Sequence, residues 1–144
     1  MIEQDTIRLL RECDAGIKMG ISSIEDVLPN VKSQELTQTL IHCRDEHQQL
    51  SSEIQKLLDR YGDEGKNPNP IAIGMSWMKT NMKLGMKETD DTIAGLMTDG
   101  CNMGVKSLSK YLNQYQAADE PSKDITKRLI RIEQQLADDV RPFL

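Results

Sequence analysis

Apolar residues recur in steps of three and four along two long stretches of this chain, and each series includes one polar residue. The first series is Ile7, Leu10, Asp14, Ile17, Ile21, Ile24 and Leu28, and the second is Leu36, Leu40, Cys43, His47, Leu50, Ile54 and Leu57. This spacing is typical of helices that pack together in a bundle. Asp14 and His47 occupy positions where an apolar side chain is cheaper to bury. The pattern therefore predicts a helical bundle with polar groups in its core.

Turn-forming residues divide the chain into five predicted helices, at about residues 3–28, 33–60, 71–87, 90–117 and 122–140. Pro29 ends the first helix, because the residue before a proline disfavours helical geometry. Ser33 is a candidate N-cap for the second. No run of alternating apolar and polar residues predicts a strand. We expect one all-α domain over residues 1–144, built as two antiparallel hairpins joined by a long crossover with its own helix. This is the ferritin-like connectivity of a four-helix bundle.

Composition excludes several classes of function. The net charge is −5 and no basic cluster stands out, which argues against a nucleic-acid-binding surface. No segment reaches the roughly 20 apolar residues of a membrane helix. The first residues contain no apolar stretch of the signal-peptide kind. Three cysteines occur without a CxxC pair. We therefore expect a cytoplasmic protein that binds neither nucleic acid nor membrane.

Asp14 and His47 are the strongest candidates for a polar site. They lie on neighbouring helices of one predicted hairpin, and we expect them at similar depth in the bundle. An aspartate oxygen and an imidazole nitrogen both suit iron, manganese or zinc, so the two residues could form half of a metal site. The alternative is a hydrogen-bonded pair that only sets the register of the helices. No Glu-x-x-His motif, which di-metal bundles use, occurs in the chain.

Sulfur-containing residues form two weaker candidate sites. Cys13 and Cys43, with His42, could bind Cu(I) or Zn(II). The predicted helix at 71–87 carries the thioethers of Met75, Met78, Met82 and Met86, which could bind Cu(I). Buried cysteines and methionine stripes are more often packing residues, and such a methionine stripe also suits contact with another subunit.

Residues 9–58 resemble the opening hairpin of a bacterial ferritin-like family of unknown function, within the ferritin and rubrerythrin superfamily. The resemblance rests on Asp14-Ala15-Gly16 in the first helix, on His47, Leu50 and Glu53-Ile54 in the second, on Trp77-Met78 in the crossover and on the ending Val140-Arg141-Pro142-Phe143-Leu144. It implies a ferritin-like fold over nearly the whole chain.

The same resemblance implies a degenerate metal site. Family members tend to have Glu-x-x-His on the last helix, where this chain has Glu133 followed by Leu136. They tend to have a Cys-Glu-x-Gly-Glu run on the third bundle helix, where this chain keeps Cys101 and Gly104 and lacks both acids. We therefore expect a non-enzymatic bundle without a cofactor that forms homo-oligomers or binds a protein partner. The alternatives are an iron, manganese or zinc protein that uses Asp14, His47 and Glu133, and a Cu(I)-handling protein that uses Cys and Met.

Overall fold

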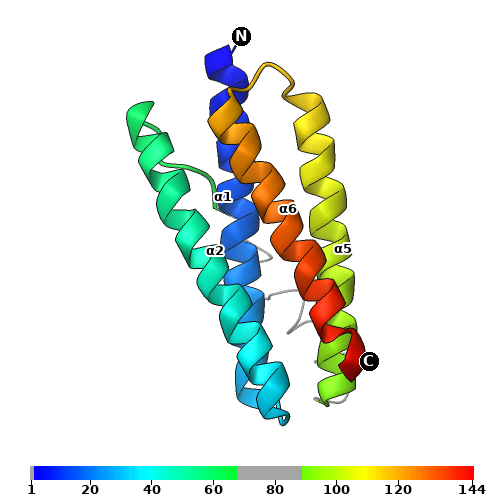
Figure 1. The fold of residues 1–144 in the computed structure, drawn as a ribbon. Coiled ribbons are helices and arrows are strands. Elements are labelled where there is room, and N and C mark those ends of the chain that lie inside the picture. The colour runs from blue at the N-terminus through cyan, green and yellow to red at the C-terminus, as the bar shows by residue number, and fades with distance from the viewer. Residues whose placement is uncertain (1, 68–88) are drawn as a thin grey trace.

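A computed structural model describes residues 2–67 and 89–144 of the protein (Figure 1). All regular elements in these two ranges are helical, which confirms the all-α prediction. The predicted helix at 71–87, with its methionines and Trp77, lies outside the described residues. None of the described helices combines the length and the apolar character that a membrane span requires.

The first hairpin follows the predicted boundaries closely. Helix α1 spans Ile2–Val27 and continues as a 3-10 turn at Leu28–Asn30, where Pro29 prevents further α-helix. Helix α2 spans Gln34–Arg60, and the hydroxyl of its N-cap Ser33 accepts a hydrogen bond from the Leu36 amide at 3.3 Å. The predicted cap of α2 is therefore confirmed.

The second hairpin differs from the prediction at its turn. Helix α5 spans Asp90–Gln114 and ends three residues before the predicted position 117. Helix α6 spans Glu120–Val140 and begins two residues before the predicted position 122. The reason for the earlier start is that Asp119 is the N-cap, and its carboxylate accepts a hydrogen bond from the Ser122 amide at 2.9 Å. A last 3-10 turn covers Arg141–Phe143.

The four long helices pack as a bundle of two antiparallel hairpins. Helix α2 packs against α1 and α6, and α5 packs against α6 and α1. Figure 1 shows that α2 and α5 run in the same direction, as do α1 and α6. Helix α2 therefore ends, and α5 begins, at opposite ends of the bundle (Figure 1).

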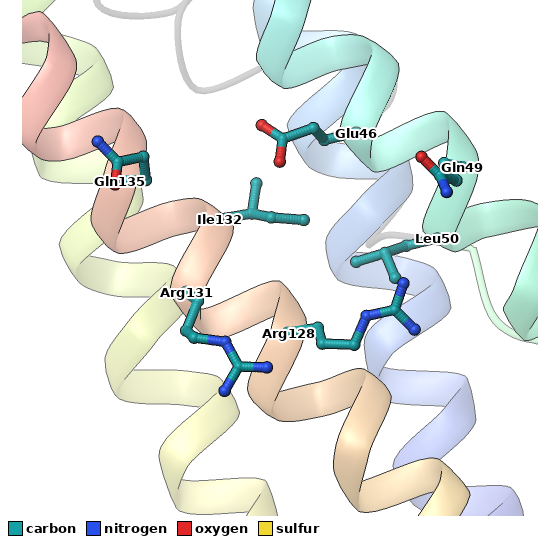
Figure 2. Close-up of a pocket in the computed structure, with 7 residues that line it drawn as sticks. All are labelled: Glu46, Gln49, Leu50, Arg128, Arg131, Ile132 and Gln135. Atoms are coloured by element: carbon teal, nitrogen blue, oxygen red, sulfur yellow. The ribbon is translucent and has the colours of Figure 1, made fainter.

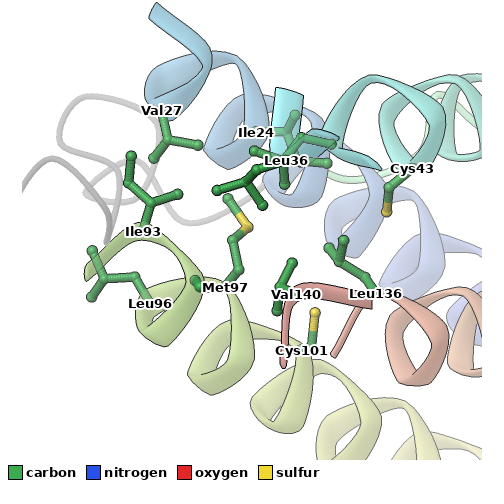
Figure 3. Packing of buried hydrophobic residues seen from close by; sticks show 12 residues of the cluster. Ile24, Val27, Leu36, Cys43, Ile93, Leu96, Met97, Cys101, Leu136 and Val140 are labelled. Carbon is green, nitrogen blue, oxygen red and sulfur yellow. The ribbon is translucent and has the colours of Figure 1, made fainter. Parts of the chain in front are cut away.

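The apolar core consists of two clusters, one toward each end of the bundle. The first lies near the α1–α2 turn and includes Ile24, Val27, Leu36, Leu40, Cys43, Ile93, Met97, Cys101, Leu136 and Val140 (Figure 3). The second includes Leu10, Cys13, Ile17, Leu50, Ile54, Leu58, Leu108, Ile125 and Leu129. The residues of the second predicted series are buried along α2, except that Leu57 is only partly buried. The same spacing on α6 gives Ile125, Leu129, Ile132, Leu136 and Val140, of which only Ile132 is partly buried.

The buried face of α5 agrees with the sequence pattern only near the start of the helix. The pattern predicts Ile93, Leu96, Gly100, Met103, Ser107 and Tyr111 on one face, and Ile93 and Leu96 are buried, but Met103 is 57% exposed. The helix buries instead a face that includes Met97, Cys101 and Leu108. At about 100° per residue, Cys101 and Leu108 lie within about 40° of Met97 around the helix, whereas Met103 lies about 120° away and so points off the core side.

Candidate functional site: a buried polar layer

A buried ion pair lies between the two apolar clusters. His47 of α2 is 1% exposed and Glu133 of α6 is 13% exposed, and His47 Nε2 lies 2.9 Å from Glu133 Oε1. The other ring nitrogen, Nδ1, lies 2.8 Å from the backbone oxygen of Cys43, one turn earlier on α2. Both ring nitrogens therefore have acceptors, as a protonated imidazole requires.

Helices α1 and α5 present glycines to this pair. A Cβ atom built on Gly20 of α1 would lie 2.8 Å from His47 Nε2, and one built on Gly104 of α5 would lie 3.6 Å from the Glu133 carboxyl carbon. We call Gly20, His47, Gly104 and Glu133 the central polar layer. Each hairpin contributes a glycine from its first helix and an ionisable residue from its second. The glycines leave the space that the imidazole and the carboxylate occupy.

The environment of the layer favours a charged imidazole. Burial by itself lowers the pKa of His47, whereas hydrogen bonds with the Cys43 side chain, 3.6 Å from Nδ1, and with the Glu133 carboxylate raise it, and the charge of Glu133 adds to the rise. The hydrogen bonds prevail, and the pKa of His47 rises to about 10. His47 is therefore an imidazolium at neutral pH, and it donates both ring N–H groups.

Two thiols next to the layer are held in the neutral form. Burial raises the pKa of Cys43, although its hydrogen bond with His47 opposes the rise. Burial also raises the pKa of Cys101 far above its ordinary value, and the neighbouring Glu133 carboxylate adds to the effect. Since the thiolate is the form that binds metals and attacks electrophiles, these cysteines are poor ligands and poor nucleophiles in the folded protein.

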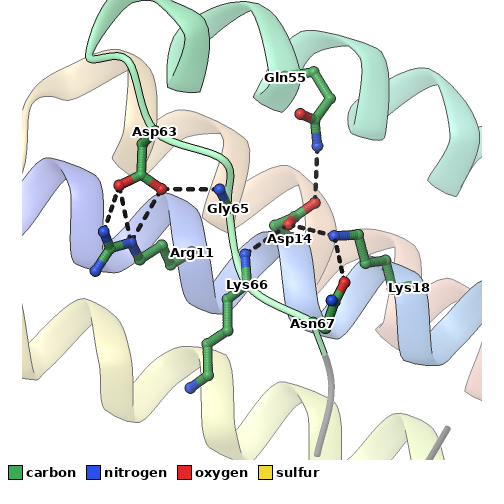
Figure 4. A network of polar contacts seen from close by, with 8 residues as sticks. All are labelled: Arg11, Asp14, Lys18, Gln55, Asp63, Gly65, Lys66 and Asn67. Carbon is green, nitrogen blue, oxygen red and sulfur yellow. Dashed lines mark hydrogen bonds and ion pairs between the residues drawn. The ribbon is translucent and has the colours of Figure 1, made fainter.

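Asp14 does not belong to the central polar layer, so the predicted Asp14–His47 pair is wrong. Asp14 is completely buried, and its carboxylate accepts hydrogen bonds from Lys18 Nζ at 2.8 Å, Gln55 Nε2 at 3.0 Å and the Lys66 amide at 2.9 Å (Figure 4). Both of its oxygens are therefore occupied.

The register of the first hairpin explains this separation. Asp14 and His47 lie equally far from the ends of α1 and α2, so a symmetric turn would place them level. The 3-10 turn at Leu28–Asn30 prolongs α1 before the chain reverses. This three-residue extension accounts for part of the offset, and Gly20, not Asp14, faces His47. Six residues along a helix amount to about 9 Å.

The Asp14 network holds the segment that follows α2 against α1. Beside Asp14, the Arg11 guanidinium pairs with Asp63, and Lys66 Nζ lies 2.6 Å from Glu12 Oε1. Gly65 has a φ of +85°, and a Cβ there would overlap Asp14 Oδ2, so this position requires glycine on both grounds. The network explains the buried carboxylate as a structural anchor for residues 63–66.

The predicted cysteine cluster does not form. Cys13 belongs to the core cluster that includes Leu10, and its sulfur lies 3.2 Å from Thr126 Oγ1. Cys43 belongs to the other core cluster. His42 is exposed on α2 and lies 3.3 Å from Glu46 Oε1. The Met75, Met78, Met82 and Met86 run lies outside the described residues.

The residues of the central polar layer do not fit a di-metal centre. Such a centre draws carboxylate and imidazole ligands from all four helices, whereas Gly20 and Gly104 provide no donor atom from α1 and α5. Within residues 2–67 and 89–144, no group of three or more His, Cys, Asp or Glu side chains is arranged to hold a metal ion. His47 and Glu133 come together as an ion pair, and Asp14 lies apart from them.

Sequence reasoning missed the glycine that makes room for the pair. Gly20 lies between Ile17 and Ile24 on the buried face of α1, inside a helix where glycine costs about 1 kcal/mol relative to alanine. That cost was the available signal of a close contact. Compared with protein-family models, with curated proteins and with solved structures, the chain matches none.

Proposed function

We propose that this protein is a non-enzymatic bundle of the ferritin-like type that acts by associating with itself or with a protein partner. In this proposal the centre of the bundle stabilises the fold and binds no metal. The observation that carries it is the His47–Glu133 pair, in which the two best donor residues at the bundle centre bind each other.

The connectivity supports the ferritin-like part of the proposal. The two hairpins are antiparallel, and α2 and α5 run in the same direction, an arrangement that ferritin-like folds share (Figure 1). The two hairpins also repeat one arrangement: a glycine on the first helix faces an ionisable residue on the second. Such a repeat is expected if the hairpins descend from a bundle with equivalent ligand positions.

The association part rests mainly on the chain's methionines. Met75, Met78, Met82 and Met86 form a stripe at helical spacing, and methionine suits adaptable contacts with another protein. Met103 adds an exposed apolar side chain on α5. A cytoplasmic location agrees with a partner-binding role and remains part of the proposal.

Two measurements on untagged protein test the proposal. Elemental analysis should find far less than one iron, manganese, zinc or copper ion per chain after purification without chelators. Light scattering at increasing concentration should find a mass above the 16.3 kDa of one chain. A stoichiometric metal that is lost in His47→Leu would favour the metal-binding alternative. A strict monomer at high concentration would remove self-association and leave a different protein as partner.

A further inference from the structure

A groove of about 340 Å³ opens between α2 and α6 (Figure 2). The groove is distinct from the central polar layer, because neither His47 nor Glu133 lines it. Leu50 of α2 is buried and Ile132 of α6 is partly buried, and these two residues supply its apolar lining. A volume of this size lies at the lower end of the range for small-molecule sites.

Positively and negatively charged side chains lie at opposite ends of the groove. Arg128 and Arg131 lie toward one end, and Glu46 lies toward the other, near Gln135 (Figure 2). Arg128 donates two hydrogen bonds to the Glu53 carboxylate, both at 2.8 Å, so its charge is largely compensated. Arg131 is exposed and no described residue pairs with it. The groove therefore has one uncompensated cation at the arginine end and a carboxylate at the opposite end.

We propose that this groove binds a small monocarboxylate with an apolar chain. The ligand carboxylate pairs with Arg131, since a guanidinium presents a planar set of donors that matches a carboxylate. The apolar chain lies over Leu50 and Ile132, and Gln49 offers its amide at the rim. The inference stands on the groove alone and holds whether or not the bundle associates.

The lining discriminates against other ligand classes. A dicarboxylate that pairs one end with Arg131 and extends along the groove would bring its second carboxylate toward Glu46. The two negative charges would repel each other. A neutral alcohol would lack the charge-assisted hydrogen bond to Arg131. A folded protein partner needs roughly 800 Å² of surface per side, which seven lining residues do not supply.

An NMR titration of the ¹⁵N-labelled full chain with octanoate tests the proposal. Saturable shifts should appear at amides of residues 46–53 and 128–135, with a Kd of about 1 mM, the range expected for a ligand of roughly ten heavy atoms. Octanol and suberate, the uncharged and dicarboxylate analogues of the same chain length, should bind at least roughly tenfold more weakly.

A pair of charge-matched variants separates the groove from general electrostatics. Arg131→Gln should weaken octanoate binding roughly tenfold, whereas Lys106→Gln, an exposed cation on α5, should leave it unchanged. Shifts that do not saturate, equal binding of octanol, or equal effects of the two variants would each overturn the proposal. The comparison of octanoate with octanol and suberate uses only the parent protein, so the test stands even if Arg131→Gln fails to fold.

Discussion

Replacing Gly20 by alanine should destabilise the protein, although alanine is the better helix former. A Cβ at this position would lie 2.8 Å from His47 Nε2 and 2.9 Å from Cδ2. The ring cannot rotate away without loss, because Nδ1 is hydrogen bonded to the Cys43 oxygen and Nε2 to Glu133. To reach an ordinary contact the imidazole has to move by about half an ångström or more.

The expected magnitude follows from two opposing effects. Crowding a packed core costs about 1–3 kcal/mol, and breaking a buried ion pair costs about 3–5 kcal/mol. The gain in helix propensity is about 1 kcal/mol. The net loss is about 0–2 kcal/mol if the ring shifts with its ion pair intact and about 2–4 kcal/mol if the pair breaks, so we expect Gly20→Ala to lower the free energy of unfolding by about 2 kcal/mol. Gly16, on the same helix, is exposed and has no described atom within 4 Å of the Cβ position, so Gly16→Ala should raise it by about 0.5–1 kcal/mol.

Urea denaturation followed by far-UV circular dichroism at pH 7 measures both changes. A loss of 2 kcal/mol moves the midpoint by roughly 1 M urea. In a His47→Ala background the ring is absent, and Gly20→Ala should then be neutral or stabilising. If Gly20→Ala is as stable as Gly16→Ala in the parent protein, the imidazole does not occupy the space next to α1 and the reasoning fails.

Three further predictions concern the buried ionisable groups. His47→Leu alone should lower the free energy of unfolding by about 3–5 kcal/mol, because it leaves Glu133 unpaired. The double variant His47→Leu with Glu133→Leu should lie within about 1 kcal/mol of the parent in urea melts. Equal stability of the single variant and the parent would contradict this prediction. The pKa of His47 is about 10 in the folded protein, against an ordinary value of 6.5 in the unfolded chain. The stabilisation that protonated His47 gives the fold is therefore complete below pH 6.5 and is lost as the pH rises toward 10. Between pH 6.5 and 8.5 the unfolding free energy should fall by up to about 1.4 kcal/mol per pH unit, and the double variant should flatten this slope. Gly65→Ala should lower the free energy of unfolding by at least about 1 kcal/mol more than Gly62→Ala in thermal melts. Both positions have positive φ, but a Cβ at Gly65 overlaps Asp14, whereas one at Gly62 has open space. Equal losses would mean that the Asp14 side chain can move aside.

The sequence was sufficient to predict the helices because the signals were local. Pro29 and Ser33 defined the first turn, and the repeat of apolar residues defined α2 over its full length. The buried face of α5 was harder to predict, because Gly100, Met103 and Gly104 give a weak apolar signal and only packing decides which side faces the core. Caps and periodicity act within a few residues, so they describe elements better than their relative placement.

The candidate site was harder to predict because it depends on register. His47 was identified as a polar residue in the core, and Glu133 through the resemblance, but nothing local to either residue shows that they meet. The pairing depends on how far Leu28–Asn30 prolong α1 and on how α6 lies against α2. Asp14 is buried as predicted, but its partners are Lys18 of α1, Gln55 of α2 and the Lys66 amide in the segment after α2.

The charges of the central polar layer also determine which hairpin pairs with which. The first hairpin contributes an imidazolium from His47 and the second a carboxylate from Glu133, so the two hairpins of one chain are complementary. Two first hairpins placed together would bring two buried imidazoliums into contact, and two second hairpins would bring two carboxylates. Unpaired like charges in a low-dielectric core cost several kcal/mol. An apolar pair would stabilise the bundle equally well but would not distinguish these arrangements. The buried ion pair therefore favours pairing of the first hairpin with the second over pairing of two like hairpins. A stability measurement on the native bundle alone does not detect this preference.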